Sequence, residues 1–399
     1  MSGREGALAR LRAWWFWRQG LSARGAPRTI ADCLRRSGWL PTAGSTGVYL
    51  SIRARLPATS REAIDRAAID GTEVVEVPGA HARPPVLVPR DECALALRLH
   101  RASFVRHAAP LFASGRYSEA ALRAIERQVC EALDQGPLST SQIRASVTHP
   151  DAGELLIGAL IDLAVRGIIR RFSAEARLDA SSYLYELRHP DDRPDLDGDG
   201  DAAEVARKAT RAALHRYGPA SAAEIADWSA LTKTDVRRAL TELHAERVEI
   251  DGWPGPAWLL PDDVRAWKAF QADEARVVLL PYRDPFVAVR RPPAVLTSRP
   301  DAVVLNPAQK PIAIRDASGV NQHTIVAGGE LIGVWEYDPD ARRVLTRVWS
   351  TNRTLRARVA DAAADTQRFI REQLGDARRS AVDPPDRRAA RAAFVRQSR

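Results

Sequence analysis

The feature that most constrains the fold is an internal repeat centred on a Gly-Pro turn. The segment LDQGPLSTSQIRA at residues 133–145 is echoed by HRYGPASAAEIAD at residues 215–227. In both segments a helical pattern ends at Gly-Pro, and a small hydroxyl residue then opens an amphipathic helix. Each segment continues into another helix and two short candidate strands, and the pattern of residues 28–100 predicts an earlier copy. The repeat therefore favours a chain built from similar modules.

The modules have the order helix, turn, helix, helix and β-hairpin, which is the winged-helix order. From residue 276 onwards, alternating apolar residues and Gly-Gly and Asp-Pro turns predict a small β-barrel. The predicted fold class is mainly α with β-wings: tandem winged-helix (helix-turn-helix) domains plus a small C-terminal β-barrel. The predicted parts are winged-helix-like domain 1 (1–112), winged-helix domain 2 (113–190), an acidic linker (191–203), winged-helix domain 3 (204–272), the β-barrel domain with its helix (273–374) and a basic flexible tail (375–399).

The linker contains the run DLDGDG from Asp195, which resembles the opening of a calcium-binding loop. The twelfth position of such a loop supplies a bidentate Glu, and in this chain it is Ala206. We therefore interpret the run as an acidic linker and expect no metal there.

The charge of the chain indicates a polyanionic partner. The formal net charge is +9, and 59 basic residues face 50 acidic ones. Nearly all the basic residues are arginine, whose planar guanidinium suits phosphates and guanine edges. A GC-rich coding bias is an equally good explanation for arginine in place of lysine, but it does not explain the net excess.

Several classes of function are disfavoured by what the sequence lacks. The three cysteines are far apart and have no metal-ligand spacing, and no HExxH, GxSxG, Walker or Rossmann glycine motif is present. No apolar run approaches the roughly 18 residues that a membrane span needs. The N-terminus has no signal-peptide pattern. We expect a cytoplasmic, nucleoid-associated monomer with no metal, no cofactor and no membrane contact.

The best candidate for a DNA-reading helix lies in the third module. It opens with TKTDVRR, in which Thr232 or Thr234 can cap the helix. Lys233, Arg237 and Arg238 supply cations for DNA binding at the face expected to enter the major groove.

The equivalent helix of the second module is nearly all apolar, with the sequence GELLIGALIDLAVRG. We expect it to pack inside, while Arg170 and Arg171 in the following strand reach DNA phosphates. Only one of the three modules has a basic recognition helix. This favours a protein that clamps DNA and has its functional site elsewhere in the chain.

Motifs in order along about residues 8 to 350 carry a family resemblance. They are RQGL (18–21), SIRARLPATS (51–60) followed by AIDRA, GPLSTSQIR, GPASAAEIADWSAL, LLPYRDPF and GGELIGVWEYD. The chain resembles the bacterial winged-helix DNA glycosylases of the AlkZ/YcaQ crosslink-repair type. The resemblance implies three tandem winged helices and a C-terminal β-barrel around a basic channel for double-stranded DNA. It also implies metal-free hydrolysis of the N-glycosidic bond of alkylated or crosslinked purines.

The resemblance further implies a Gln, an apolar residue and a second Gln (or Asp) before the proline of SIRARLP. Those side chains hold the attacking water and stabilise the developing sugar cation, whereas this chain has Arg53 and Arg55. Arginine accepts no hydrogen bond, and a cation destabilises an oxocarbenium-like transition state. If the segment is extended, both guanidinium groups lie on one side. They therefore fit DNA phosphates better than hydrolysis.

A carboxylate elsewhere is the alternative source of catalysis. Asp284 of LLPYRDPF stands where the family keeps an Asp after LLP, so it is the candidate catalytic residue, or else it caps the turn before Pro285. Glu62 and Asp65 lie close in sequence to the two arginines. We expect them either to take part in catalysis or to form ion pairs with these arginines.

The sequence is compatible with three functions. The first is a monofunctional DNA N-glycosylase, a hydrolase of AlkZ/YcaQ type, that acts in DNA repair or alkylation tolerance. The second is a non-catalytic DNA binder or transcriptional regulator, which the Arg-x-Arg pair favours. The third is a structural winged-helix protein whose partner is another protein. Salt separates the third from the others, because phosphate contacts lose affinity steeply as salt rises.

Overall fold

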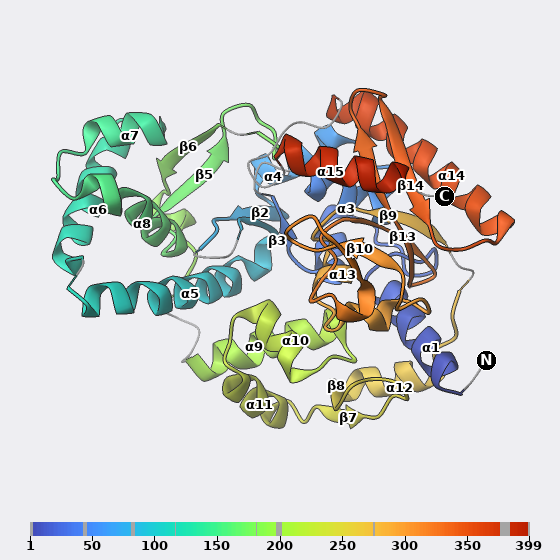
Figure 1. Ribbon diagram of the computed structural model, residues 1–399. Coiled ribbons are helices and arrows are strands. Elements are labelled where there is room, and N and C mark those ends of the chain that lie inside the picture. The colour runs from blue at the N-terminus through green and yellow to red at the C-terminus, as the bar shows by residue number, and fades with distance from the viewer. Residues whose placement is uncertain are drawn as a thin grey trace. The chain divides into compact units, whose positions relative to one another are not determined.

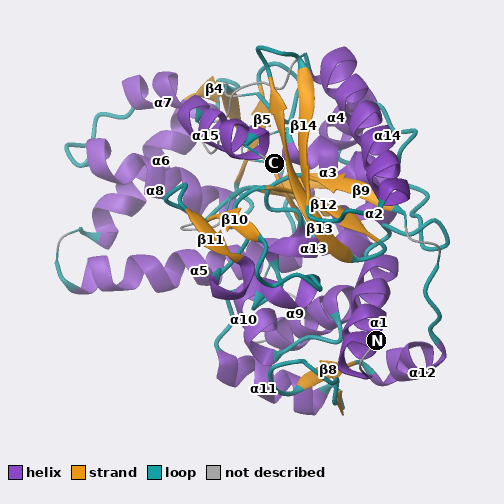
Figure 2. Cartoon of the chain, turned by 45° about the vertical axis from the view of Figure 1, so that its right-hand side comes forward, coloured by secondary structure: helices purple, strands orange, loops and turns teal. Residues whose placement is uncertain are grey.

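The computed structural model describes residues 3–42, 46–80, 84–115, 117–180, 182–196, 202–273, 276–375 and 384–397 (Figure 1). These residues form helices and several small antiparallel sheets, joined by loops (Figure 2). The chain forms two compact units, each with its own contacts. Unit 1 combines residues 1–40, 45–64 and 206–399, and unit 2 combines residues 41–44 and 65–205.

The second module shows how the Gly-Pro repeat folds. Ser139 accepts a hydrogen bond from the Gln142 backbone N–H, and the Gln142 side chain accepts one from the Ser139 N–H, so the two form a capping box. The short strand before this cap pairs with the last strand of the module, giving the sheet order β4-β6-β5. The elements are α6 (Glu119–Leu133), β4 (Leu138–Ser139), α7 (Thr140–Ser146), α8 (Ala152–Val165), β5 (Ile169–Ser173) and β6 (Tyr183–Leu187).

The third module repeats this order. Ser221 and Glu224 form the equivalent capping box, and Ala220 forms a bridge with Trp258 of the closing hairpin. The elements are α9 (Ala202–Tyr217), α10 (Ala222–Ser229), α11 (Lys233–Glu242), β7 (Glu246–Val248) and β8 (Ala257–Leu259).

The N-terminal segment has the same element order, so the internal repeat extends to three copies. Its sheet order, β1-β3-β2, matches that of the second module. The elements are α2 (Ile30–Ser37), β1 (Leu40–Pro41), α3 (Gly47–Arg55), α4 (Arg61–Asp70), β2 (Val74–Val77) and β3 (Val86–Pro89). The helix α5 (Cys93–Ala113) follows, after the short turn of 3-10 helix at Arg90–Glu92.

The apolar helix of the second module packs inside unit 2, as its sequence predicts. Its buried residues include Leu156 and Leu160, which belong to one cluster with Ile125 and Val129 of α6. The cluster excludes water from both helices and stabilises their contact by about 25 cal/mol per Å² of apolar surface buried.

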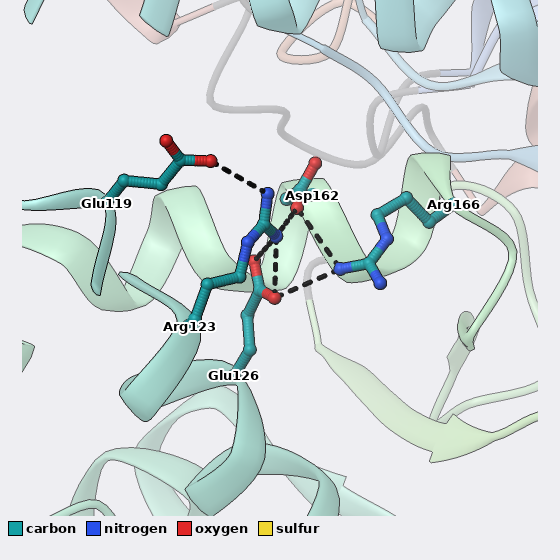
Figure 3. Close-up of polar contacts among 5 residues, drawn as sticks. All are labelled: Glu119, Arg123, Glu126, Asp162 and Arg166. Atoms are coloured by element: carbon teal, nitrogen blue, oxygen red, sulfur yellow. Dashed lines mark hydrogen bonds and ion pairs between the residues drawn. The ribbon is translucent and has the colours of Figure 1, made fainter. Parts of the chain in front are cut away.

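A charged network holds the same two helices together at the edge of this core (Figure 3). Arg123 of α6 donates to Asp162 of α8 at 2.5 Å and to Glu126 at 2.8 Å. Arg166 donates to Glu126 at 3.0 Å. Burial, and then the Asp162 carboxyl, raise the pKa of Glu126 above its ordinary value, although Arg123 acts to lower it. Two nearly buried carboxylates are thus joined by two partly exposed guanidinium groups.

The first helix, α1 (Gly3–Arg18), is held by its aromatic residues in the core of unit 1. The Trp14 indole N–H donates to the Gly218 carbonyl at 2.8 Å, and that of Trp15 donates to the Pro219 carbonyl at 3.1 Å. The Gly-Pro turn of the third module is therefore a docking point for α1.

The C-terminal part is an antiparallel sheet of order β14-β13-β12-β9 and a separate pair, β10 and β11. Gly329 turns the chain between β12 and β13 with φ of +96°, and a Cβ there would collide with the Arg12 carbonyl of α1. The elements are α12 (Pro261–Ala269), β9 (Val277–Leu280), α13 (Pro285–Ala288), β10 (Val303–Leu305), β11 (Pro311–Ala313), β12 (His323–Ala327), β13 (Glu330–Asp338), β14 (Arg343–Val348) and α14 (Arg353–Phe369), which is extended by a π-helical turn at Ile370–Leu374, with 3-10 turns at Pro293–Leu296 and Ile314–Asp316.

The prediction of a flexible tail at 375–399 is wrong for most of its described residues, because they form a helix, α15 (Pro385–Arg396). α15 packs on β13 and β14 of the sheet (Figure 2). Arg391 donates to the buried Glu336 at 2.5 Å, and Phe394 is buried. Burial acts to raise the pKa of Glu336, but His323 and Arg391 lower it below its ordinary value. The arginines that suggested a loose segment are thus partly structural.

Part of the predicted acidic linker, residues 197–201, lies outside the described residues, and with it most of the DLDGDG run. A short 3-10 turn at Pro190–Asp192 overlaps the start of this linker. Elsewhere, among the residues that the structure describes, no helix is long and apolar enough to cross a membrane.

Candidate functional site

The Arg-x-Arg segment is helical, not extended. Arg53 and Arg55 lie in the last turn of α3, where two residues correspond to a rotation of about 200°. The two guanidinium groups therefore lie in different surroundings, and the expectation that an extended segment would place them on one side does not hold. Their partners are Asp365 for Arg53 and Asp284 for Arg55.

Arg55 is a buried structural cation. Its side chain is 0% exposed, and its Nη1 and Nη2 donate to Asp284 at 2.7 and 2.9 Å in a bidentate pair. Nε donates to the Gln19 carbonyl and Nη1 also to the Ser51 carbonyl, both at 2.9 Å. Burial acts to lower the pKa of Arg55, but Asp284 outweighs it and raises the pKa. In this structure the group is not presented to a DNA phosphate.

Asp284 is also buried, and protein donors occupy both of its carboxylate oxygens. Its side chain is 0% exposed, and its Oδ1 accepts the Phe286 backbone N–H at 3.0 Å in addition to Arg55. It is the N-cap of α13, which is the capping alternative considered for this residue. Both oxygens are used by protein donors, and neither is open to a water molecule. The structure therefore brings Arg55 and Asp284 together as a fold-stabilising pair.

A buried thiol, Cys33, lies close enough to this pair to interact with its charges. Burial raises the pKa of Cys33 to about 12, although the charge of Arg55 acts to lower it. The thiol is protonated at neutral pH and is not a nucleophile.

Arg53 has a different environment. Its Nη2 lies 3.3 and 3.4 Å from the two carboxylate oxygens of Asp365, and its guanidinium carbon lies 5.1 Å from the Phe369 ring centroid. The Nε atom is buried and has no hydrogen-bond partner. The side chain is 21% exposed and lines a cavity of about 120 Å³.

The cavity lies within unit 1, between the end of α3, the start of β9 and the C-terminal half of α14. Arg276 is its second basic residue, and one of its Nη atoms donates to the Leu21 carbonyl at 3.2 Å. Burial, and then repulsion from Arg55, lower the pKa of Arg276. The remaining lining residues are mostly apolar: Leu50, Ala54, Pro57, Val277, Val278, Leu279, Ala362, Thr366 and Phe369.

Glu62 and Asp65 do not pair with the two arginines. Glu62 lies 3.2 Å from Arg61 and is mostly exposed. Asp65 is buried in unit 2 and accepts the Leu178 backbone N–H at 3.1 Å. Closeness in sequence was a poor guide here, because both carboxylates have other partners.

The predicted DNA-reading helix is α11, and Thr232 is its N-cap, accepting the Asp235 backbone N–H at 3.1 Å. Lys233 and Arg237 are exposed and make no ion pair among the described residues. Arg238 is also exposed, but it lies 3.2 Å from Asp235. Two of the three predicted cations are thus open to a polyanion.

The strand arginines of the second module are both paired. Arg170 forms an ion pair with Glu186 on the neighbouring strand, and half of its side chain is exposed. Arg171 donates to Glu76 at 3.1 Å, and its guanidinium carbon lies 3.8 Å from the Tyr183 ring centroid. Arg171 is therefore packed inside unit 2, and Arg170 is the more accessible of the two.

The cavity residues Arg276, Asp365 and Phe369 were not identified from the sequence. They lie more than 200 residues after Arg53, and none belongs to a recognisable motif. Among the described residues, no group of three or more His, Cys, Asp or Glu side chains is arranged to hold a metal ion.

Comparisons with known proteins agree with the predicted resemblance. The profile of the DNA glycosylase AlkZ-like family matches residues 25–369. The fold is similar to that of the Streptomyces sahachiroi DNA glycosylase AlkZ, with a TM-score of 0.69 and 17% identity, covering 92% of this chain and 97% of that chain. No curated protein matches the sequence. Because the family match spans most of the chain, the protein belongs to the AlkZ-like DNA glycosylase family.

Proposed function

We propose that the protein binds double-stranded DNA in the repair or tolerance of alkylated bases. The observation that carries this proposal is the family match over residues 25–369. The exposed cations Lys233 and Arg237 at the start of α11 support it, because a capped helix following a short helix and turn is the element that winged-helix proteins place in the major groove. The net charge of +9 also favours binding to a polyanion such as DNA.

The buried pair limits how hydrolysis can occur. A glycosylase needs a group that polarises water and stabilises an oxocarbenium-like sugar. Arg55 and Asp284 are fully buried and bound to each other, which disfavours both groups for this task. Arg53 is a permanent cation and accepts no hydrogen bond. For these three residues, the contribution to catalysis that remains is to position an alkylated base, which is already cationic.

The second candidate function is therefore monofunctional N-glycosylase activity, which family membership favours. The experiment is base release under protein excess. The protein is incubated with duplexes carrying N7-alkylguanine or an interstrand crosslink, and free base is measured by mass spectrometry. An unmodified duplex and a heat-denatured sample are the controls.

Two results separate the functions. Salt-sensitive binding without base release supports a non-catalytic DNA binder. Base release above both controls assigns glycosylase activity. No binding at low salt to any of the duplexes would contradict the proposal as a whole.

A further inference from the structure

The cavity beside Arg53 contains more positive charge than its own residues neutralise. Among the described residues that line it, Asp365 is the only carboxylate, and this group already has a closer partner, because Arg368 donates to it at 2.9 Å. The contacts from Arg53 at 3.3 and 3.4 Å are longer than the 2.7–2.9 Å typical of charge-assisted hydrogen bonds. Arg53 is therefore a second and weakly bound partner of a carboxylate that is already neutralised.

Arg276 adds a further cation without a carboxylate of its own. The described residues give it one hydrogen bond, to a backbone carbonyl, and no ion pair. A guanidinium group carries five N–H donors, so most of those on Arg276 are open to a ligand or solvent. Placing two such groups around one cavity is unfavourable unless an anion joins them.

The shape and walls of the cavity favour an oxyanion over a flat aromatic base. The guanidinium of Arg53 lies over the Phe369 ring, so this aromatic face is covered and not free to stack on a base. The Nη2 of Arg53 is held by Asp365 only at 3.3 and 3.4 Å, so a ligand with two or three oxygens can take the place of this carboxylate. Apolar residues, among them Leu50 and Val278, line most of the rest of the cavity and offer a ligand no competing charge.

We infer that the cavity formed by Arg53, Arg276 and Asp365 is a binding site for a phosphate-type oxyanion. Arg53 and Arg276 grip the oxygens, and Asp365 competes with the ligand for Arg53. The oxyanion is either a free phosphate or the phosphate of a nucleic acid, and the second source alone rests on the proposed function.

The experiment is a titration with inorganic phosphate, followed by isothermal calorimetry and by the melting temperature at constant ionic strength. We expect saturable binding with a rise in Tm in the wild type. Arg53→Gln and Arg276→Gln should each weaken the affinity by about tenfold or more, because each removes charge-assisted hydrogen bonds. Arg371→Gln is the matched control: it removes one positive charge from the exposed turn after α14 but does not line the cavity.

Asp365→Asn makes the proposal testable even if an arginine variant does not fold. Removing the competing carboxylate should tighten phosphate binding, a gain that a purely structural role of these residues does not predict. Absence of saturable binding in the wild type overturns the proposal. So does an equal response of the wild type, Arg53→Gln and Arg371→Gln, which indicates a general salt effect.

A second arm identifies the source of the oxyanion. If the site holds a nucleic-acid phosphate, phosphate competes with duplex binding, and Arg53→Gln lowers the salt slope of duplex binding by about one. If the site holds a free oxyanion, Arg53→Gln leaves the salt slope of duplex binding unchanged but loses phosphate binding. Because the phosphate titration contains no DNA, failure of DNA binding leaves its result intact.

Discussion

Arg53 and Arg55 lie on one helical turn and have opposite surroundings. Arg55 is 0% exposed and makes four hydrogen bonds of 2.7 to 2.9 Å. Arg53 is 21% exposed, makes two contacts of 3.3 and 3.4 Å and leaves its Nε unpaired. The difference arises from helix geometry, which directs residues two apart to different sides. A saturated arginine stabilises the fold, whereas an unsaturated one beside a cavity is available for a ligand.

The strongest test of this difference is Asp284→Ala. It leaves the Arg55 guanidinium buried without its carboxylate, and we expect unfolding to become easier by about 3–5 kcal/mol. Urea denaturation measures the change. The matched control is Asp365→Ala, which removes the partner of Arg53 at a site where both side chains are partly exposed. It should cost under about 1 kcal/mol.

The double variant Arg55→Met with Asp284→Asn distinguishes a buried unpaired charge from general disruption. Removing both charges should restore part of the lost stability, because replacing a buried ion pair by neutral groups is often tolerated. Equal losses in the single and double variants would show that packing, not the charge, determines the cost.

A second prediction concerns the network of Figure 3, in which two carboxylates, Glu126 and Asp162, lie together, whereas Arg53 and Arg55 each face one carboxylate. Burial, and then Asp162, raise the pKa of Glu126 above its ordinary value of 4.5. The protonated carboxyl is therefore favoured by folding, so its contribution to stability is present below the unfolded pKa and lost as pH rises through the folded pKa. Glu126→Gln should flatten the pH dependence of stability just above pH 4.5, measured by denaturation at several pH values. An unchanged pH profile would contradict the assignment.

A third prediction extends the comparison of free and paired arginines to α11. Arg237→Gln removes an exposed cation without an ion pair and should lower the salt slope of duplex binding by about one. Arg238→Gln, whose side chain is paired with Asp235, should change the slope less. Fluorescence anisotropy over a series of salt concentrations provides both values. Equal slopes for the two variants would show that the pair opens on DNA.

The sequence predicted the local elements well and the long-range pairs poorly. The Gly-Pro repeat, the Ser caps and the apolar helix α8 follow from spacing over a few residues, and all three are present. The partners of Arg53 and Arg55 lie 312 and 229 positions away, where no local pattern identifies them. The arginines of the tail predict a loose segment, but Arg391 neutralises a buried Glu336, which only the folded sheet presents.

The smallest expected effect is that of Arg53→Gln on stability. Its ion pair is long and partly exposed, so we expect a loss of under about 1 kcal/mol in urea denaturation without phosphate. The same variant should lose the stabilisation that phosphate gives the wild type. A small structural effect together with a large ligand effect is the pattern of a binding residue, because the charge is then needed mainly when the oxyanion is present. A loss as large as that of Asp284→Ala would instead place Arg53 beside Arg55 as part of the folded core, and the comparison between them would collapse.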